Sequence, residues 1–266
     1  MDAPIRHIVL IGAGNMATVL GKALLQAGLQ ISQVFNRTLS SAEALAKELS
    51  CPYTDQLDQL YREADLYLLC VSDQAIEYLS SQLSFLDEKL IAHTSGATPG
   101  SIFEGYFRRY GVFYPLHSLS KTQPIELSNV PLCIDARDET DLASLESLAQ
   151  QLSQGVYRID DQQRSLLHVA AVFANNFSNH LYNLMDQWLS DEEIPFDMLR
   201  PLILGGAQKV QNLSPREAQT GPAIRADLNT IKRHLEILQE RRPELVELYK
   251  ILTESINPGL IQNKTT

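Results

Sequence analysis

HIVLIGAGNMA, residues 7–17, joins a short apolar run to a glycine-rich turn. The run predicts a β-strand from His7 to Ile11, and the residues after the turn predict a helix from Asn15 to Ala27. A G-x-G-x-x-A pattern in this position is typical of a loop that holds the phosphates of a dinucleotide at a helix N-terminus. The alternative is a glycine turn that holds no ligand. The expected cofactor contacts lie in the turn and the first helical residues, namely Gly12, Ala13, Gly14, Asn15 and Met16.

Outward from this turn, short apolar runs alternate with amphipathic stretches over residues 1–160. This alternation is the pattern of β-α-β units in a parallel sheet. LYLLCV, from Leu66 to Val71, is apolar throughout, as expected for a strand that is covered on both faces. Further strands are predicted over 31–35, 89–93, 111–114, 130–134 and 155–159, and helices over 40–49 and 138–152. The predicted fold class is α/β, a doubly wound and mostly parallel sheet followed by an all-α C-terminal domain.

The character of the chain changes after Asp161. Arg164 to Leu189 contains no Gly or Pro, and its apolar residues recur at helical spacing, which predicts one long helix. Prolines at 195, 201, 215, 222 and 243 then divide the remainder into shorter helices, and the Ser-Pro-Arg-Glu stretch at 214–217 is a capping box. We therefore expect two domains. Residues 1–160 would bind the cofactor. Residues 161–266 would form a helical domain that contributes to the substrate site and joins two subunits into a dimer.

Composition narrows the class of protein. The 266 residues carry a formal net charge of −10, so we expect no nucleic-acid partner, which would need a basic surface. No stretch approaches the roughly 20 apolar residues that span a bilayer, so no membrane partner is expected either. The three cysteines share no metal-ligand spacing, and no cluster of Asp, His or Glu has the spacing of a metal site. We expect a cytoplasmic protein with reduced thiols, no bound metal and a small-molecule substrate.

The second predicted strand ends in Asn36-Arg37-Thr38. Sites for NAD usually place Asp or Glu here, because a carboxylate accepts hydrogen bonds from the ribose 2′-hydroxyl. No carboxylate is present in this chain. Arg37 can pair with a 2′-phosphate as a planar cation, and Asn36 and Thr38 can add donors. The sequence therefore favours NADP(H), the alternative being an exposed turn with an incidental arginine.

These motifs resemble the Rossmann domains of the 6-phosphogluconate dehydrogenase-like superfamily, which includes pyrroline-5-carboxylate reductases and F420-dependent NADP reductases. The resemblance is carried by GAGNMA at 12–17, NRT at 36–38 and VSDQAI at 71–76. HTSG at 93–96, YPLHSLS at 114–120, AAVFANNF at 170–177 and TGPAIRAD at 220–227 resemble a narrower group, proteins that join such a domain to a DUF2520 domain. The resemblance implies an NADP oxidoreductase that dimerises through its helical domain. In this chain Ala226 stands where the motif usually has Gly.

The resemblance also implies further cofactor contacts. Two loops are expected at the carboxyl edge of the sheet, where ligands of such sheets bind. The first follows the third strand and lies along the ribose and nicotinamide. The second follows the next strand. The residues concerned are Val71, Ser72, Asp73 and Ile76 in the first loop and Thr94, Ser95 and Gly96 in the second.

The sequence indicates the catalytic residue less clearly than the cofactor-binding residues. In the β-hydroxyacid dehydrogenase relatives, a lysine four residues before an asparagine performs the acid/base step. If Asn176 takes the place of that asparagine, the lysine position is occupied by Val172, which cannot exchange a proton. With α-helical spacing, one face is shared by His168, Val172, Asn175 or Asn176, and Asn179. His168 is therefore a candidate general acid. His117 in YPLHSLS is a second candidate, and Asn176 is the third residue that we assign to the catalytic group. Each of these side chains has a structural alternative.

Arg225 and Asp227 could bind a polar substrate, although Asp227 could equally cap the following helix. The expected function is NADP(H)-dependent reduction or oxidation of a small-molecule C=O or C=N bond, without the lysine mechanism. Two alternatives remain open. One is a non-catalytic NADP(H)-binding sensor or regulatory module. The other is an F420-dependent NADP reductase.

Overall fold

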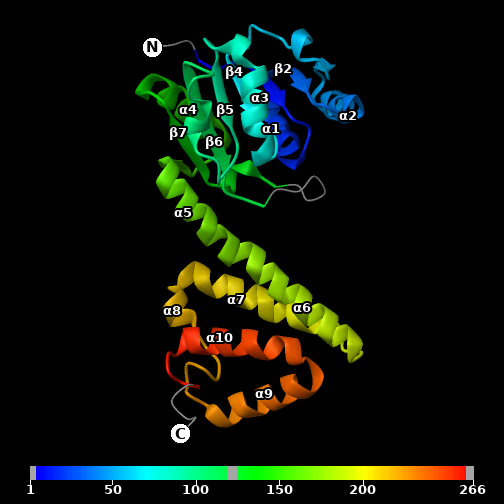
Figure 1. The fold of residues 1–266 in the computed structure, drawn as a ribbon, viewed down its shortest axis with the longest axis vertical. Coiled ribbons are helices and arrows are strands. Elements are labelled where there is room, and N and C mark those ends of the chain that lie inside the picture. Colours follow the sequence, from blue (N-terminus) through cyan, green and yellow to red (C-terminus); the bar gives the residue numbers. More distant parts are fainter. Residues whose placement is uncertain (1–3, 119–124, 262–266) are drawn as a thin grey trace. The chain divides into compact units, whose positions relative to one another are not determined.

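The computed structural model describes residues 4–118 and 125–261, and the chain falls into two compact units (Figure 1). We call Met1–Asn176 the sheet unit and Phe177–Thr266 the helical unit. Each is described by itself. None of the described helices combines the length and the apolar character that a membrane span requires.

The sheet unit is built on eight strands in the order β3-β2-β1-β4-β5-β6-β7-β8. Neighbouring strands are parallel except for β6 and β7, which are antiparallel. The strands are β1 (His7–Ile11), β2 (Gln30–Phe35), β3 (Tyr53–Thr54), β4 (Leu66–Leu69), β5 (Leu90–His93), β6 (Arg109–Pro115), β7 (Leu132–Ala136) and β8 (Val156–Arg158). Five long helices accompany them: α1 (Asn15–Gln26), α2 (Leu39–Leu49), α3 (Asp73–Gln82), α4 (Glu139–Leu152) and α5 (Asp161–Ala171). The predicted fold class is confirmed.

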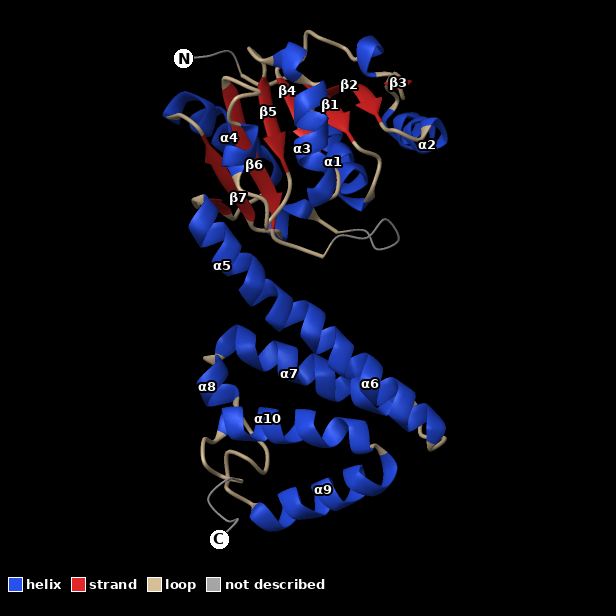
Figure 2. Ribbon diagram, viewed as in Figure 1, coloured by secondary structure: helices blue, strands red, loops and turns tan. Residues whose placement is uncertain are grey.

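Both faces of the sheet are covered by helices, as Figure 2 shows. Along β1, Ile8 and Leu10 join the core beneath α1, α2 and α4, whereas Val9 and Ile11 join the core beneath α3. All four side chains are fully buried. A strand with both faces covered must be apolar at every position, which explains the uninterrupted apolar runs of the sequence.

The sheet ends at Arg158, close to the boundary expected near residue 160. The two compact units, however, meet further along the chain than residue 160, between Asn176 and Phe177. Helix α5 therefore belongs to the sheet unit. The cause is a set of contacts that α5 makes with the loop after β5, which are described below. The helix begins at a capping box, in which Asp160 accepts from the backbone N–H of Gln163 and Gln163 accepts from that of Asp160.

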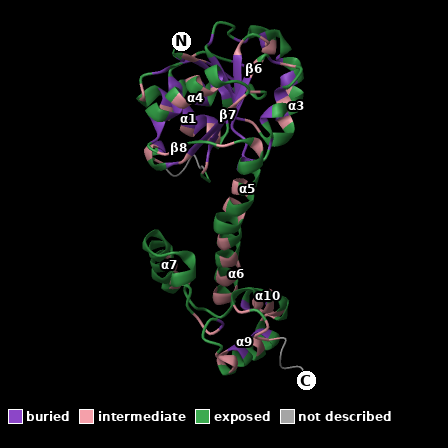
Figure 3. Ribbon diagram, turned by 90° about the vertical axis from the view of Figure 1, so that its left-hand side faces the viewer, coloured by how far each residue is buried: buried purple, intermediate pink, exposed green. Residues whose placement is uncertain are grey.

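The helical unit consists of α6 (Ser178–Asp191), α7 (Arg200–Asn212), α8 (Pro215–Ala218), α9 (Leu228–Arg241) and α10 (Val246–Ile256). Figure 3 shows little buried surface here, in contrast to the sheet unit. Neither α6 nor α7 has a buried residue. Among the described residues of this unit, the buried apolar side chains are those of Ala223, Ile231, Leu238 and Leu245.

The long helix predicted from Arg164 to Leu189 is interrupted. Residues Val172–Phe177 form a π-helix between α5 and α6. A π turn inserts an extra residue and rotates everything that follows it, and such turns are frequent at functional sites. The spacing expected for His168, Val172 and the asparagines is therefore not that of one regular α-helix beyond Val172.

Candidate functional site

The glycine turn after β1 has the shape that a dinucleotide loop needs. Gly12 has φ +117°, and a Cβ atom there would lie 2.3 Å from the carbonyl oxygen of Cys70. Its backbone N–H donates to the carbonyl oxygen of Phe35 at 2.7 Å. The turn can therefore pass between β2 and β4 only with glycine at this position.

Gly14 differs from Gly12 because its surroundings are open. A Cβ atom at Gly14 would meet nothing within 4 Å. The residue is the N-cap of α1, it has no side-chain capping bond, and the first turn of α1 holds no acidic residue. Asn15 is exposed and Met16 half-buried, and they follow directly. The N-terminus of α1 thus offers free N–H groups and a favourable dipole at an accessible surface, which fits a bound pyrophosphate.

The turn after β2 also fits the cofactor. Asn36 Nδ2 donates to the carbonyl oxygen of Thr38 at 3.1 Å, which shapes the turn. Arg37 is exposed, and no described residue forms an ion pair or hydrogen bond with its guanidinium. Thr38 is the N-cap of α2 and makes no side-chain capping bond, and the first turn of α2 contains no acidic residue. A guanidinium, a hydroxyl and a helix N-terminus are therefore free to receive a phosphate.

The residues expected in the loop after β4 have different surroundings. Ser72 and Asp73 are exposed at the N-terminus of α3, and Val71 is half-buried. Ile76 is fully buried and packs in the core beneath α3. The structure therefore places Ile76 away from the surface where the other three residues lie.

The loop after β5 is held by its own side chains. Thr94 Oγ1 donates to the carbonyl oxygen of Leu69 at 3.2 Å, and Ser95 Oγ accepts from the backbone N–H of Ala97 and of Thr98 at 3.1 and 2.9 Å. Both side chains are buried. The side chains of Thr94 and Ser95 thus stabilise the loop, whereas Gly96 is the residue at which the loop approaches Tyr114 and His168.

His93, at the end of β5, is a structural residue. Its Nδ1 accepts from the backbone N–H of Ser95 at 3.2 Å, and its Nε2 lies 3.4 Å from the carbonyl oxygen of Pro99. Burial and the charge of Arg164 lower the pKa of His93 to about 4. The ring is therefore neutral at physiological pH and fixes the loop.

A pocket of about 630 Å³ lies beside this loop, within the sheet unit. This volume is in the usual range for small-molecule sites. His117, His168 and Asn176, which were the catalytic candidates, all line it, together with Val172 and Asn175. Its other lining residues include Tyr114, Leu116, Ser118, Leu167, Ala170, Ala171 and Ala174. The structure thus brings the three candidates together in one pocket.

Two residues of this region were not predicted. Tyr114 Oη lies 3.3 Å from His168 Nδ1, at the wall of the pocket. Tyr114 stands at the start of the YPLHSLS motif, but only the histidine of that motif was singled out. The second missed residue is Arg164.

Arg164 fastens α5 to the loop after β5. Its side chain is 1% exposed, and Nη2 donates to the carbonyl oxygen of Thr98 at 2.8 Å and to Asp161 Oδ1 at 2.5 Å. Asp161 Oδ1 also accepts from the backbone N–H of Gly100 at 2.8 Å. This network holds the first turn of α5 against the carboxyl edge of the sheet and so places His168, one turn further along, at the pocket.

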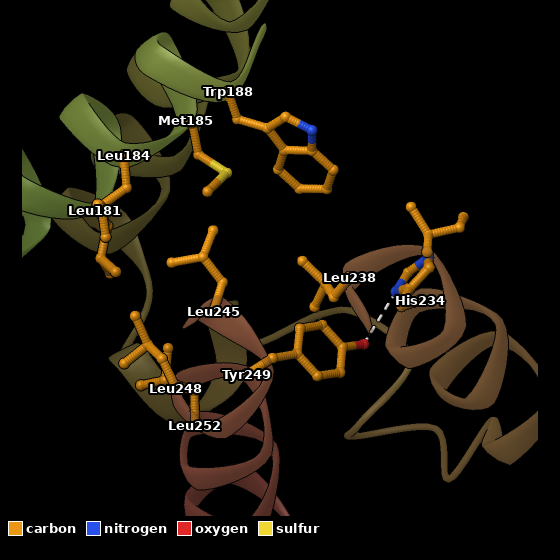
Figure 4. Close-up of a pocket in the computed structure, with 11 residues that line it drawn as sticks. Leu181, Leu184, Met185, Trp188, His234, Leu238, Leu245, Leu248, Tyr249 and Leu252 are labelled. Carbon is orange, nitrogen blue, oxygen red and sulfur yellow. Dashed lines mark hydrogen bonds between the residues drawn. The ribbon is translucent and has the colours of Figure 1, made fainter. Parts of the chain in front are cut away.

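The helical unit contains a second pocket, of about 460 Å³ (Figure 4). It is lined by apolar side chains of α6, α9 and α10, among them Trp188, Leu238 and Leu252. One polar pair interrupts the lining, since His234 Nδ1 lies 2.9 Å from Tyr249 Oη. Among the described residues, no three His, Cys, Asp or Glu side chains could together hold a metal ion.

Asp227 acts as a helix cap. Its Oδ1 accepts from the backbone N–H of Thr230 at 3.1 Å and its Oδ2 from the Thr230 hydroxyl at 2.7 Å, at the start of α9. The preceding residue, Ala226, has φ +52°. This is the left-handed region that favours glycine, which accounts for the glycine usual at this point of the motif.

Two family models match the chain. Residues 7–95 match "NADP oxidoreductase coenzyme F420-dependent", and residues 130–256 match "Domain of unknown function (DUF2520)". The solved structure of a "putative NADP oxidoreductase" from Bacteroides fragilis is 42% identical, covers 95% of this chain and 98% of its own, and superposes with a TM-score of 0.87. The chain therefore belongs to this family of two-domain NADP oxidoreductases, and NADP is the cofactor of its class.

More distant structures share the fold. An imine reductase from Myxococcus stipitatus, solved with NADP+, is 19% identical, covers 95% of both chains and has a TM-score of 0.68. A glutamyl-tRNA reductase from Methanococcus maripaludis is 33% identical over 88 residues, which are 32% of this chain and 23% of that protein. The chain thus matches less than a quarter of the length of that curated relative.

Proposed function

We propose that this protein is an NADP(H)-dependent oxidoreductase that acts on a C=N or C=O bond of a small molecule. One observation carries the proposal. Tyr114 and His168 line the pocket that also contains His117 and Asn176, and both lie against Gly96 in the loop after β5. This loop follows the carboxyl end of a strand in the same sheet whose β1 and β2 end in the two turns that we propose to hold the phosphates. In doubly wound sheets this edge is where ligands bind.

The roles of the residues follow from their positions. The N–H groups at the start of α1 would hold the pyrophosphate, and Arg37 with Thr38 would hold the 2′-phosphate. Bound NADPH supplies a hydride. The remaining need is a proton for the substrate heteroatom, and the polar side chains of the pocket are the groups available for it.

An imine or an unactivated carbonyl is a better substrate class than a β-hydroxy acid. Val172 lines the pocket, and it occupies the lysine position of the β-hydroxyacid dehydrogenases if Asn176 takes the place of their asparagine. The imine reductase and reductive aminase among the structural neighbours, although distant, are named for C=N reduction. Half of the residues that line the pocket are Leu, Ala or Val, and the lining includes no Asp, Glu, Lys or Arg among the described residues, which suits an uncharged organic substrate.

Turnover separates this proposal from the sensor alternative. Initial rates of NADPH oxidation are measured with 2-methyl-1-pyrroline, cyclohexanone and a β-hydroxy-acid pair as probes. We expect the imine or the ketone to be reduced and the β-hydroxy acid to be inert. NADPH binding without turnover of any probe contradicts the enzymatic proposal and favours a binding module.

A second candidate is hydride exchange between NADP and coenzyme F420, because the family model that covers residues 7–95 carries that description. An absorption spectrum and mass spectrum of the purified protein test it. Co-purified deazaflavin, or reduction of added F420 by NADPH, would support this candidate over the imine and carbonyl reaction.

We also propose a cytoplasmic homodimer joined through the helical unit. Large apolar side chains on α7, such as Leu202 and Leu204, are exposed. The four buried apolar residues described in this unit are too few to stabilise it as a separate monomeric domain. All three cysteines are free, as in reducing compartments. Light scattering coupled to size-exclusion chromatography tests the dimer, and a monomeric mass at micromolar concentration contradicts it.

A further inference from the structure

Tyr114 and His168 form a hydrogen-bonded pair in the wall of the pocket. Tyr114 Oη lies 3.3 Å from His168 Nδ1, and the two rings meet edge to face with centroids 6.3 Å apart. Tyr114 stands near the carboxyl end of β6, and His168 stands on α5. Both side chains line the pocket, so the pair presents polar atoms to whatever occupies it.

The pair lies directly against the loop after β5. A Cβ atom at Gly96 would lie 2.6 Å from Tyr114 Cζ and 2.7 Å from His168 Nδ1. Real side chains do not tolerate such distances, so the loop can approach the pair only with glycine at this position. The same loop lies at the sheet edge where the proposed cofactor binds. The pair is therefore placed between this edge and the pocket.

The pair retains hydrogen-bonding capacity for a ligand. Within residues 4–118 and 125–261, neither Tyr114 Oη nor His168 Nε2 has a further hydrogen-bond partner. If His168 donates from Nδ1, the phenol proton of Tyr114 is free to point into the pocket. The other polar side chains of the pocket are poorer proton donors. His117 is exposed, and its Nδ1 lies 3.1 Å from the carbonyl oxygen of Ser118. The amides of Asn175 and Asn176 do not act as acids.

We propose that Tyr114 donates the proton to the substrate heteroatom and that His168 resupplies it. The inference rests on the proposed function. As the substrate carbon receives the hydride, the electron pair of the C=N or C=O bond moves to the nitrogen or oxygen, which takes the proton of Tyr114 Oη. The phenolate takes the Nδ1 proton of His168, and Nε2 takes one from water. The sum is addition of one hydride and one solvent proton.

The surroundings keep the phenol protonated until it reacts. Burial raises the pKa of Tyr114, and Cys133 on β7 adds to this effect. Arg164 on α5 lowers the pKa and Asp73 on α3 raises it, and these two contributions are smaller. A phenol that is protonated at neutral pH can act as a general acid whenever the transition state places negative charge on a neighbouring atom.

The test compares Tyr114→Phe with Tyr157→Phe. Tyr157 lies on β8 with 54% of its surface exposed, so it is a matched control outside the pocket. NADPH affinity is measured by fluorescence titration. The turnover number kcat is measured with cyclohexanone and with 2-methyl-1-pyrroline as substrates. Tyr114→Phe is expected to lower kcat about 10²- to 10⁴-fold with NADPH affinity unchanged. His168→Asn is expected to lower kcat by about tenfold or more and to change its pH profile. Tyr157→Phe is expected to leave both quantities unchanged.

A binding measurement keeps the test independent of turnover. Calorimetry follows 2-pyrrolidinone, whose carbonyl accepts a hydrogen bond, as it binds to protein saturated with NADP+. Tyr114→Phe is expected to weaken this binding about tenfold. The proposal is overturned if Tyr114→Phe keeps kcat within about twofold of wild type, or if the lactam binds both proteins equally or does not bind wild type. Absence of NADPH binding, in contrast, overturns the proposed function itself.

Discussion

Arg164 Nη2 donates a hydrogen bond to the carbonyl oxygen of Thr98, and this contact joins α5 to the loop that follows β5. The two residues are 66 positions apart in the chain. The contact explains why the first part of the long helix belongs to the sheet unit. It also explains how His168, on the next turn of α5, comes to lie beside Gly96 and Tyr114.

Arg164→Leu is expected to destabilise the sheet unit by about 2–3 kcal/mol, because Thr98 and Asp161 lose a buried donor. The matched control is Gln162→Ala, on an exposed position of the same helical turn. Urea unfolding followed by circular dichroism measures both variants. Equal midpoints for Arg164→Leu and the control would show that this network does not hold α5.

Asp161 makes the same network sensitive to acid. Burial opposes ionisation of Asp161, but hydrogen bonds from the Gly100 backbone and from Arg164 outweigh it and lower the pKa below the ordinary value of 3.8. A carboxyl whose folded pKa is lowered stabilises the protein above its unfolded pKa, and this stabilisation is lost as the pH falls through the folded pKa. Wild type should therefore lose more stability than Asp161→Asn between pH 5 and pH 2.5, values chosen to bracket that window.

The control for this pH dependence is Asp58→Asn, which removes an exposed carboxylate elsewhere in the sheet unit. Its unfolding free energy should follow the wild-type pH curve. A wild-type curve parallel to that of Asp161→Asn over the acid range would remove the role assigned to this carboxyl.

The two glycines of the first turn should respond differently to alanine. Gly12→Ala forces a side chain into φ +117° and against the Cys70 carbonyl, so we expect a loss of about 2–4 kcal/mol of stability. Gly14 has φ −81° and open surroundings, so Gly14→Ala should change stability by less than about 1 kcal/mol. Gly14→Ala should nevertheless weaken NADPH binding about tenfold or more, because its methyl group occupies the approach of the pyrophosphate. A stable Gly14→Ala protein with wild-type affinity would place the phosphates elsewhere.

Ala226→Gly should stabilise the helical unit. Relief of the left-handed conformation at φ +52° outweighs the backbone freedom that glycine gains on unfolding, by about 0.5–1 kcal/mol. Ala218→Gly, within α8, is the opposite control and should destabilise by a similar amount, about 0.5–1 kcal/mol. Thermal unfolding distinguishes the two variants, and a lower melting temperature for Ala226→Gly contradicts the prediction.

Local sequence patterns predicted the parts of this structure that depend on near neighbours. Three predictions of this kind are confirmed, since each depends on residues close together in the chain. They are the apolar strand β1, the turn at Gly12 and the capping box at Ser214. His117, His168 and Asn176 could be selected because they belong to motifs that resemble the family, and because helical spacing relates His168 to Asn176. Their common pocket followed from the topology of the sheet.

What sequence could not predict depends on contacts between distant parts of the chain. Arg164 is a charged side chain that is 1% exposed, and the contact of its Nη2 with the carbonyl oxygen of Thr98 joins residues 66 positions apart. Tyr114 has its partner 54 residues away. The π-helix at Val172–Phe177 lies within a stretch whose composition and spacing predict a continuous α-helix.

Nucleotide binding tests the central claim most directly. Calorimetric titrations compare NADPH and NADH with wild type and with Arg37→Ala. Wild type should prefer NADPH, and Arg37→Ala should lose about 10- to 100-fold in NADPH affinity while its NADH affinity stays unchanged, because a charge-assisted contact to the 2′-phosphate is removed. Folded protein that takes up neither nucleotide, or that binds NADPH and NADH equally before and after the substitution, would contradict the account.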